Sequence, residues 1–169
     1  MSVHYLAETA VNEIQSLIKT NISDALADLR ADRGDAKVST EPPQSYFFYE
    51  EAKGYRTPAV FIIARNIDFQ KDQYKANHIT AKLDIGVSVL VEDKDKEKLT
   101  IKAWRYQSAL HSILDQKIIE VTGDKAKLFL IVRSADFSPV FTASQATGTQ
   151  GVFRKEVALT VEVQQRESL

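Results

Sequence analysis

The feature that most constrains this fold is a change of hydrophobic period between residues 79 and 116. From 79 to 91 every odd position is apolar, whereas the even positions are mostly polar. The odd positions hold Ile79, Ala81, Leu83, Ile85, Val87, Val89 and Val91. Because neighbouring side chains of a strand point to opposite faces, this period of two predicts a long strand with one buried face.

The period changes after a charged connector at 92–98. Apolar residues then recur at steps of three and four: Leu99, Ala103, Tyr106, Leu110, Ile113 and Leu114. That spacing predicts an amphipathic helix over about 95–118, able to pack on the apolar face of the strand. Asp93 and Asp95 stand where carboxylates accept the free N–H groups of a first helical turn and complement the helix dipole.

Composition sets the class of protein. A chain of 169 residues, 44% hydrophobic and 27% charged, is expected to form one soluble globular domain over 1–169. A net charge of −1 lacks the basic footprint usual in nucleic-acid binders, and zero cysteines exclude disulfides and thiolate metal sites. The N-terminus shows no secretory signal and no run is apolar enough to span a membrane, so we expect a cytosol-like compartment.

Helical periodicity also marks the N-terminal region. A helix is predicted over 3–19, with an interruption at Thr20–Asn21, one or two further turns, and an end at Gly34. Ser45–Tyr49 is strand-like, and Glu50–Arg56 is typical of a hairpin turn. The apolar run 59–64 predicts a strand covered on both faces.

Further strands are predicted at 128–132 and 153–164, the second with clear alternation. The polar stretches 66–77 and 140–151 are interpreted as flexible loops, and 165–169 as a C-terminal tail. The element order predicts an α+β fold: a single, mostly antiparallel or mixed β-sheet with helices packed on one face.

No pattern for catalysis or metal binding stands out. His4, His78 and His111 are not at ligand spacing, and the acidic run 93–97 lacks the glycine and closing glutamate of a calcium loop. Ser16–Lys19 matches SxxK without the companion motifs of that enzyme class. We therefore expect no enzymatic activity, no cofactor and no metal.

The polar faces of the two long strands are the more informative surfaces. Lys82 and Asp84 on one strand, and Arg154, Glu156 and Glu162 on the other, lie opposite the apolar rows. Such a row is either a solvated sheet face or a surface that meets a second copy through complementary charges. Trp104, beside Arg105, either widens the core face of its helix or anchors a partner.

Several stretches together resemble a known family. The N-terminal helix is followed by TPAVF at 57–61, the long alternating strand, a helix carrying AWRY at 103–106, and a last strand opening with FRKEV at 153–157. In order, size and texture the chain, over about 1–165, is similar to the tail terminator proteins (tail-to-head joining, or tail completion, proteins) of long-tailed bacteriophages and prophages.

The resemblance implies a structural virion protein. Such subunits form a hexameric ring that caps the tail tube and joins it to the head connector, and DNA passes through the ring without specific binding. The partners would be further copies, the tail-tube protein and the connector protein, and assembly would take place in the bacterial host cytoplasm. Another head–tail neck subunit, or a small-ligand or enzymatic α+β domain, are the alternatives.

The candidate interface residues follow from the charged rows, the charged connector and the tryptophan. They are Lys82, Asp84, Asp93, Asp95, Trp104, Arg105, Arg154, Glu156 and Glu162.

Overall fold

The computed structural model describes residues 5–34, 38, 40–49, 54–69, 79–121, 126–142 and 151–167. Within these residues, two helices and seven strands follow one another. They are α1 (Leu6–Arg33), β1 (Ser45–Phe47), β2 (Ala59–Phe69), β3 (Ile79–Asp93), α2 (Lys96–Leu114), β4 (Ile118–Glu120), β5 (Ala126–Phe137), β6 (Phe141–Thr142) and β7 (Phe153–Glu167). Neither helix has the length of apolar sequence that crossing a membrane requires, within this described part.

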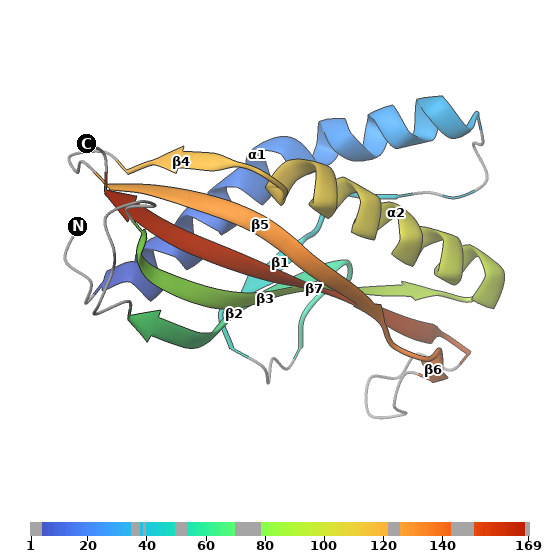
Figure 1. The fold of residues 1–169 in the computed structure, drawn as a ribbon. Coiled ribbons are helices and arrows are strands. Elements are labelled where there is room, and N and C mark those ends of the chain that lie inside the picture. The colour runs from blue at the N-terminus through green and yellow to red at the C-terminus, as the bar shows by residue number, and fades with distance from the viewer. Residues whose placement is uncertain are drawn as a thin grey trace.

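The strands form one mixed sheet in the order β1-β2-β3-β7-β5-β4, with β6 beside β7 (Figure 1). All pairs are antiparallel except β1 with β2. Both helices lie on one face of the sheet. The predicted α+β fold with a mixed sheet and helices on one face is confirmed.

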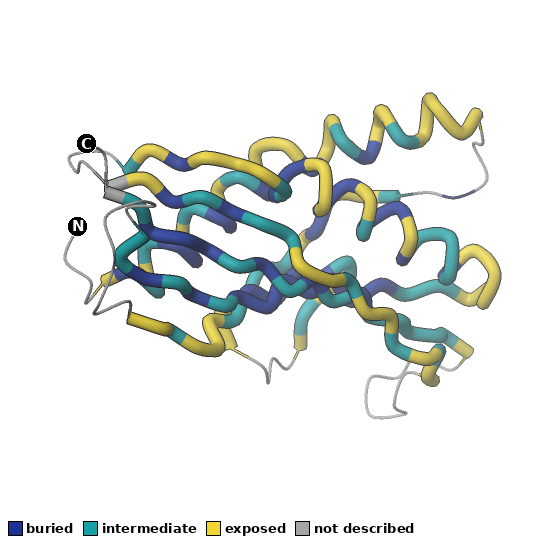
Figure 2. Tube along the Cα trace, in the orientation of Figure 1, coloured by how far each residue is buried: buried dark blue, intermediate teal, exposed yellow. Residues whose placement is uncertain are grey.

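The core forms between the helices and the odd positions of the two central strands. In β3, Ala81, Leu83, Ile85, Val87 and Val89 are fully buried, and the register places Leu83 beside Val163 of β7. The alternating strand predicted at 79–91 is therefore confirmed and ends two residues later. Figure 2 shows this buried band along the middle of the sheet, while the C-terminal end of α1 is largely exposed.

The N-terminal helix is longer than predicted. α1 runs without interruption through Thr20 and Asn21, and Gly34 closes it in the left-handed conformation at φ 62°. The buried residues Ile14, Ile18, Ile22 and Leu26 recur every four positions, so one apolar stripe spans the expected break. The side-chain amide of Asn21 donates to the carbonyl of Leu17, 2.8 Å away, within the same helix. The predicted interruption at Thr20–Asn21 was wrong because continuous burial outweighs the weak helix propensity of two residues.

Four further features differ from the sequence expectation. β1 and β2 run parallel, so the segment between them is not the hairpin predicted at Glu50–Arg56, of which 50–53 lies outside the described residues. β2 extends to Phe69 and β7 to Glu167, so 66–69 and 165–167 are strand rather than loop and tail. α2 ends at Leu114, and Ile118–Glu120 forms β4 instead of a last helical turn.

The two remaining loop predictions are tested only in part. Most of the predicted loop at 66–77 falls on 70–77, and most of the loop at 140–151 falls on 143–150, outside the described residues. Within the second stretch, Phe141–Thr142 forms the short strand β6.

Candidate functional site

The even positions of β3 and β7 share the sheet face opposite the helices. The register sets Asp84 beside Glu162, and Lys82 beside Gln164. Three predicted interface residues (Lys82, Asp84 and Glu162) therefore come together. All three are half-buried, so the structure places them in a polar layer with limited exposure.

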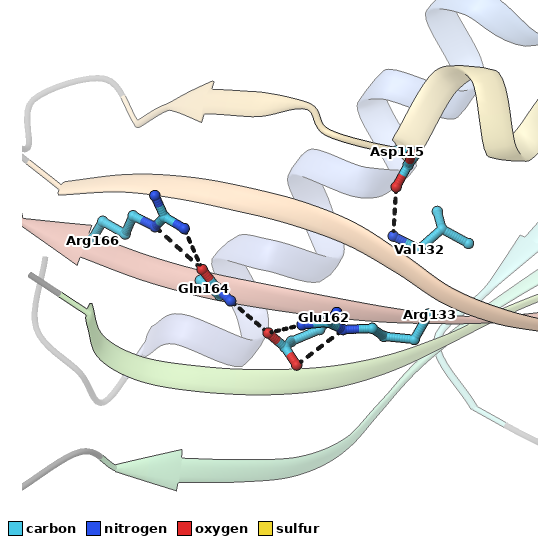
Figure 3. Close-up of polar contacts among 6 residues, drawn as sticks. All are labelled: Asp115, Val132, Arg133, Glu162, Gln164 and Arg166. Atoms are coloured by element: carbon cyan, nitrogen blue, oxygen red, sulfur yellow. Dashed lines mark hydrogen bonds and ion pairs between the residues drawn. The ribbon is translucent and has the colours of Figure 1, made fainter. Parts of the chain in front are cut away.

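A chain of hydrogen bonds organises this polar layer (Figure 3). Arg133 of β5 donates from Nη2 to Glu162 at 2.9 Å, and Gln164 Nε2 donates to the same Glu162 oxygen at 2.6 Å. Arg166 donates to Gln164 Oε1 at 2.6 Å, and its guanidinium lies 4.6 Å from the ring centroid of Phe129. The side chains cover one another, which leaves Gln164 only 6% exposed.

The charges and hydrogen bonds of the polar layer favour the ionised form of the Glu162 carboxylate. Burial raises the pKa of Glu162, but hydrogen bonds from Arg133 and Gln164, with the charges of Arg133 and Lys82, outweigh it and lower that pKa below its usual value. The same contact raises the pKa of the Arg133 guanidinium, with a smaller contribution from Asp84. Glu162 and Arg133 thus already have a charged partner within the chain.

Arg133 was missed by sequence reasoning. It follows the apolar run Leu128–Val132 and lies at a bulge in the pairing of β5 with β7, between Val132 and Ser134. A bulge adds one residue to a strand and interrupts the alternation of its side chains between the two faces. The alternation of apolar and polar residues in the sequence therefore cannot show which face of the sheet Arg133 lies on. Gln164 was on the predicted polar face, whereas Arg166 lies in the stretch predicted as a C-terminal tail, so its contacts with Gln164 and with Phe129 of β5 were not expected.

The opposite end of β3 and β7 holds a second polar cluster. Arg154 donates to Glu92 at 2.5 Å, and the Thr57 hydroxyl donates to the other Glu92 oxygen at 2.9 Å. Lys102 of α2 pairs with Asp93 at 2.6 Å. Burial raises the pKa of Asp93, but the contacts with Lys102 and the backbone of Asp95 lower it overall.

A small polar cavity lies beside this second cluster. It has a volume of about 130 Å³ and is lined by Glu41, Thr57, Pro58, Val91, Glu92, Lys102 and Tyr106. The hydroxyl of Tyr106 donates to the carbonyl of Glu41, and burial is the main reason that the pKa of this phenol is raised. Among the described residues, no group of three histidine or acidic side chains is placed to hold a metal ion.

The two aspartates of the charged connector, Asp93 and Asp95, form hydrogen bonds at the start of α2. Asp95 is the N-cap of α2, and its carboxylate accepts from the backbone N–H groups of Glu97 and Lys98 at 2.8 and 3.2 Å. Asp93 accepts from the N–H of Asp95 at 3.0 Å. The predicted capping by acidic residues at the start of α2 is confirmed. Both aspartates were also candidate interface residues, and that role stays a prediction.

The two candidate interface residues on α2 differ in their exposure to solvent. Trp104 points outward and is 54% exposed, so it does not widen the core face, whereas its neighbour Arg105 is only 7% exposed. Placing Arg105 on the surface was wrong, because α2 packs against α1 as well as the sheet and so buries a wider arc than its apolar stripe suggests. A cavity of about 360 Å³ beside them is lined by Leu29, Arg33, Ile101, Trp104, Arg105 and Ser108.

Glu156 lies away from the first row. It is half-buried near the start of β7, and its backbone N–H donates to the hydroxyl of Ser138 at 2.8 Å. The adjacent Lys155 donates to the Ser138 carbonyl at 2.6 Å. The five charged strand candidates therefore divide between two ends of the sheet and do not form one continuous charged surface.

Large apolar side chains are exposed at separate places on the surface. Phe48 and Tyr49 follow β1, Phe137 ends β5, Phe141 lies in β6, and Trp104 lies on α2. Aromatic side chains are enriched in the surfaces through which proteins bind one another.

Comparison with profiles of known protein families and with curated proteins finds no match. Among solved structures, a chain from the "Virion of native gene transfer agent (GTA) particle" is similar to this one. The two chains are 13% identical with a TM-score of 0.41, and the alignment covers 86% of this chain and 92% of that chain. A likeness at this level carries no functional argument, which rests instead on the residues of this chain.

Proposed function

We propose that this chain is a structural subunit of a phage-like particle, a tail terminator that assembles into a ring. In that role copies of the chain form a ring, expected to be a hexamer, that caps a tail tube and contacts a head connector. The proposal starts from the resemblance in element order and in the stretches TPAVF, AWRY and FRKEV. The fold agrees with it in class.

The observation that carries the proposal is the distribution of exposed aromatic residues. These residues lie in three separate stretches of the chain: Trp104 on α2, the pair Phe48 and Tyr49 after β1, and the pair Phe137 and Phe141 at the end of β5 and in β6. A ring subunit has three kinds of neighbour: further copies, the tube below and the connector above. Several separate apolar surfaces are what such a subunit needs, because each interface requires its own buried anchors.

The charged candidates take a reduced part in this proposal. Glu162, Arg154 and Asp93 each have an internal partner, so they shape the polar surface more than they offer free charges to a neighbour. Lys82, Asp84 and Glu156 remain proposed contact residues. With a net charge of −1, the ring would also let DNA pass without tight phosphate contacts.

Size in solution and electron microscopy test the proposal. We expect light scattering to report an oligomer, and negative-stain images to show rings with six-fold symmetry. A strict monomer at every concentration, also in the presence of assembled tail tubes, would contradict the ring. Measurable affinity for duplex DNA at physiological salt would contradict free passage of DNA.

A further inference from the structure

Both margins of the sheet end in a short strand that covers only part of its neighbour. β1 pairs with β2 at Ala59, Val60 and Phe61, and no described strand pairs with the rest of β2 on that side. Figure 1 shows this second half of β2, ending at Phe69, along the lower left margin of the sheet. Unpaired strand edges present free N–H and C=O groups that can template another strand.

The other margin is arranged in the same way. β4 pairs with β5 at 127–129, and the Lys117 carbonyl accepts from the N–H of Leu130 at 2.8 Å. The next outward group, the N–H of Val132, donates to the Asp115 carboxylate at 3.0 Å (Figure 3). From Ser134 to Phe137, no described strand lies on this side of β5.

The pairing register shows that the two bare segments lie at different levels of the sheet. Phe47 of β1 pairs with Phe61 of β2, and Phe61 pairs with Ser88 of β3. Ser88 in turn pairs with Ala158 of β7, which pairs with Asp136 of β5. At this level β1 is present on one margin and β5 is bare on the other. The sheet is five strands wide here: β1, β2, β3, β7 and β5.

The second level has the opposite arrangement. Ile118 of β4 pairs with Phe129 of β5, and Phe129 pairs with Gln164 of β7. Gln164 in turn pairs with Lys82 of β3, which pairs with Asp68 of β2. Here β4 is present on one margin, and on the other no described strand lies beyond β2. The sheet is again five strands wide, but displaced by one strand: β2, β3, β7, β5 and β4.

The two margins are therefore complementary steps. If a second copy is placed beside the first with the same orientation, β1 of one copy lies in the step beside β5 of the next, and β4 of the next lies beside β2 of the first. The strand directions make the first contact antiparallel and the second parallel, and both are permitted ladders. A head-to-tail contact of this kind repeats, and closes into a ring when the rotation between copies divides a full turn.

We propose that copies of this chain join edge to edge, with the β1 step of one copy seated against the β5 step of the next, so that their sheets become continuous. The inference rests on the proposed ring and specifies its interface. Residues at both bare edges are exposed, among them Arg65 and Asn66 of β2 and Ser134 and Asp136 of β5. An open cavity of about 410 Å³, lined in part by Phe48, Ile62 and Ala64, leaves room beside the β2 edge.

Cysteine cross-linking tests the edge contact in the full chain, because the natural sequence has no cysteine. Phe47 of β1 and both Ser134 and Asp136 of β5 occupy the sheet face opposite the helices, as their register with Phe61, Thr160 and Ala158 shows. Phe47 and Asp136 lie at the same level of the sheet, so we expect the double variant Phe47→Cys/Asp136→Cys to lose the monomer band under mild oxidation and to form a ladder of covalent oligomers. The second pair, Phe47→Cys/Ser134→Cys, allows for a register shift of one residue pair between copies.

The matched control is Phe47→Cys/Ala135→Cys. Ala135 is the neighbour of both test positions on the same strand, but its side chain points to the helix face, so its sulfur cannot reach a cysteine at position 47 of the next copy. We expect the monomer band to persist in this variant. Equal cross-linking in control and test variants would overturn the proposal.

The remaining outcomes separate the interface from the function. If the wild-type chain is a monomer in light scattering and no variant cross-links, the ring itself fails and this inference fails with it. If the wild-type chain forms rings but neither test pair cross-links, the ring stands and the edge contact is wrong. If the single variant Asn66→Cys alone forms covalent dimers and the test pairs do not, β2 pairs with β2 around a two-fold axis, which also overturns the proposal.

Discussion

At the scale of single residues, the polar face of the sheet is a set of internal contacts. Glu162 is held by Arg133 and Gln164, and only 15% of its side chain is exposed, whereas Arg133 is 51% exposed. Solvent screens a pair with one exposed partner, so the contribution of this pair to stability is about 1 kcal/mol or less. The contact nevertheless has a defined pH signature.

We expect Glu162→Gln to lose stability at neutral pH and to match the wild type more closely in acid. The folded pKa of Glu162 is lowered, so its stabilisation is present above the unfolded value of about 4.3 and disappears as pH falls through the folded value. Urea unfolding at pH 7 and pH 3 measures the difference. The control Glu120→Gln removes the exposed pair with Lys127 and should show a smaller change. A stability gap for Glu162→Gln that stays constant with pH would contradict this assignment.

At the scale of elements, α1 shows how burial decides helix length. The segment at Thr20–Asn21 is locally unfavourable, but Ile18 and Ile22 on either side are fully buried in the main core. Removing core methyl groups leaves a cavity, whereas exposed positions tolerate change.

We therefore expect Ile22→Ala to destabilise the protein by about 2–5 kcal/mol, the range for large-to-small changes in cores. Thr20→Ala, at the exposed neighbouring position, should be neutral or slightly stabilising because alanine is the better helix former. Chemical denaturation followed by circular dichroism compares the two. If both variants lose similar stability, a helix break near residue 20 would be the better description.

The end of α1 provides a second test at this scale. Gly34 has φ 62° and its N–H contacts the carbonyls of Arg30 and Ala31 at 3.2 Å. We expect Gly34→Ala to cost about 1 kcal/mol because a Cβ disfavours this conformation. No atom lies close enough to clash with that Cβ, so the cost is conformational. Gly34→Asn should recover part of the loss, and an equal loss in both variants would contradict a conformational origin.

At the scale of the whole molecule, the proposed assembly rests on the exposed aromatic residues and the stepped sheet margins. The helices cover one face, the polar layer lines the other, and the bare edges lie at opposite levels. A contact along the margins therefore leaves both faces available for other partners.

We expect Trp104→Ala to weaken association without destabilising the subunit. Its indole is 54% exposed, so truncation removes little core contact, whereas an interface tryptophan contributes about 2 kcal/mol or more, a loss of about thirtyfold or greater in affinity. Unfolding curves and the concentration dependence of light scattering measure the two effects. Ser108→Ala, one helical turn later on the exposed side, is the control. Unchanged association would exclude Trp104 as an anchor.

Local patterns predicted much of this molecule. Alternation between Ile79 and Val91 identified the central strand, the three-and-four spacing identified α2, and the acidic residues before α2 predicted its cap. These patterns can be read from the sequence because a half-buried helix or strand needs apolar residues at the positions that face the core, and these recur with the period of the element. The α+β class followed from the order of such elements.

The tertiary structure decided whatever depends on neighbours distant in sequence. Arg105 is buried although it lies off the apolar stripe of α2, and Arg133 meets Glu162 because a bulge in β5 turns it toward β7. β1 is parallel to β2 although the chain between them resembled a hairpin. The stepped margins arise only when β1 and β4 are placed on opposite sides of the same sheet. A one-dimensional period records which face of an element is buried, but not which element buries it, and that choice is made by packing and by strand pairing across the whole chain.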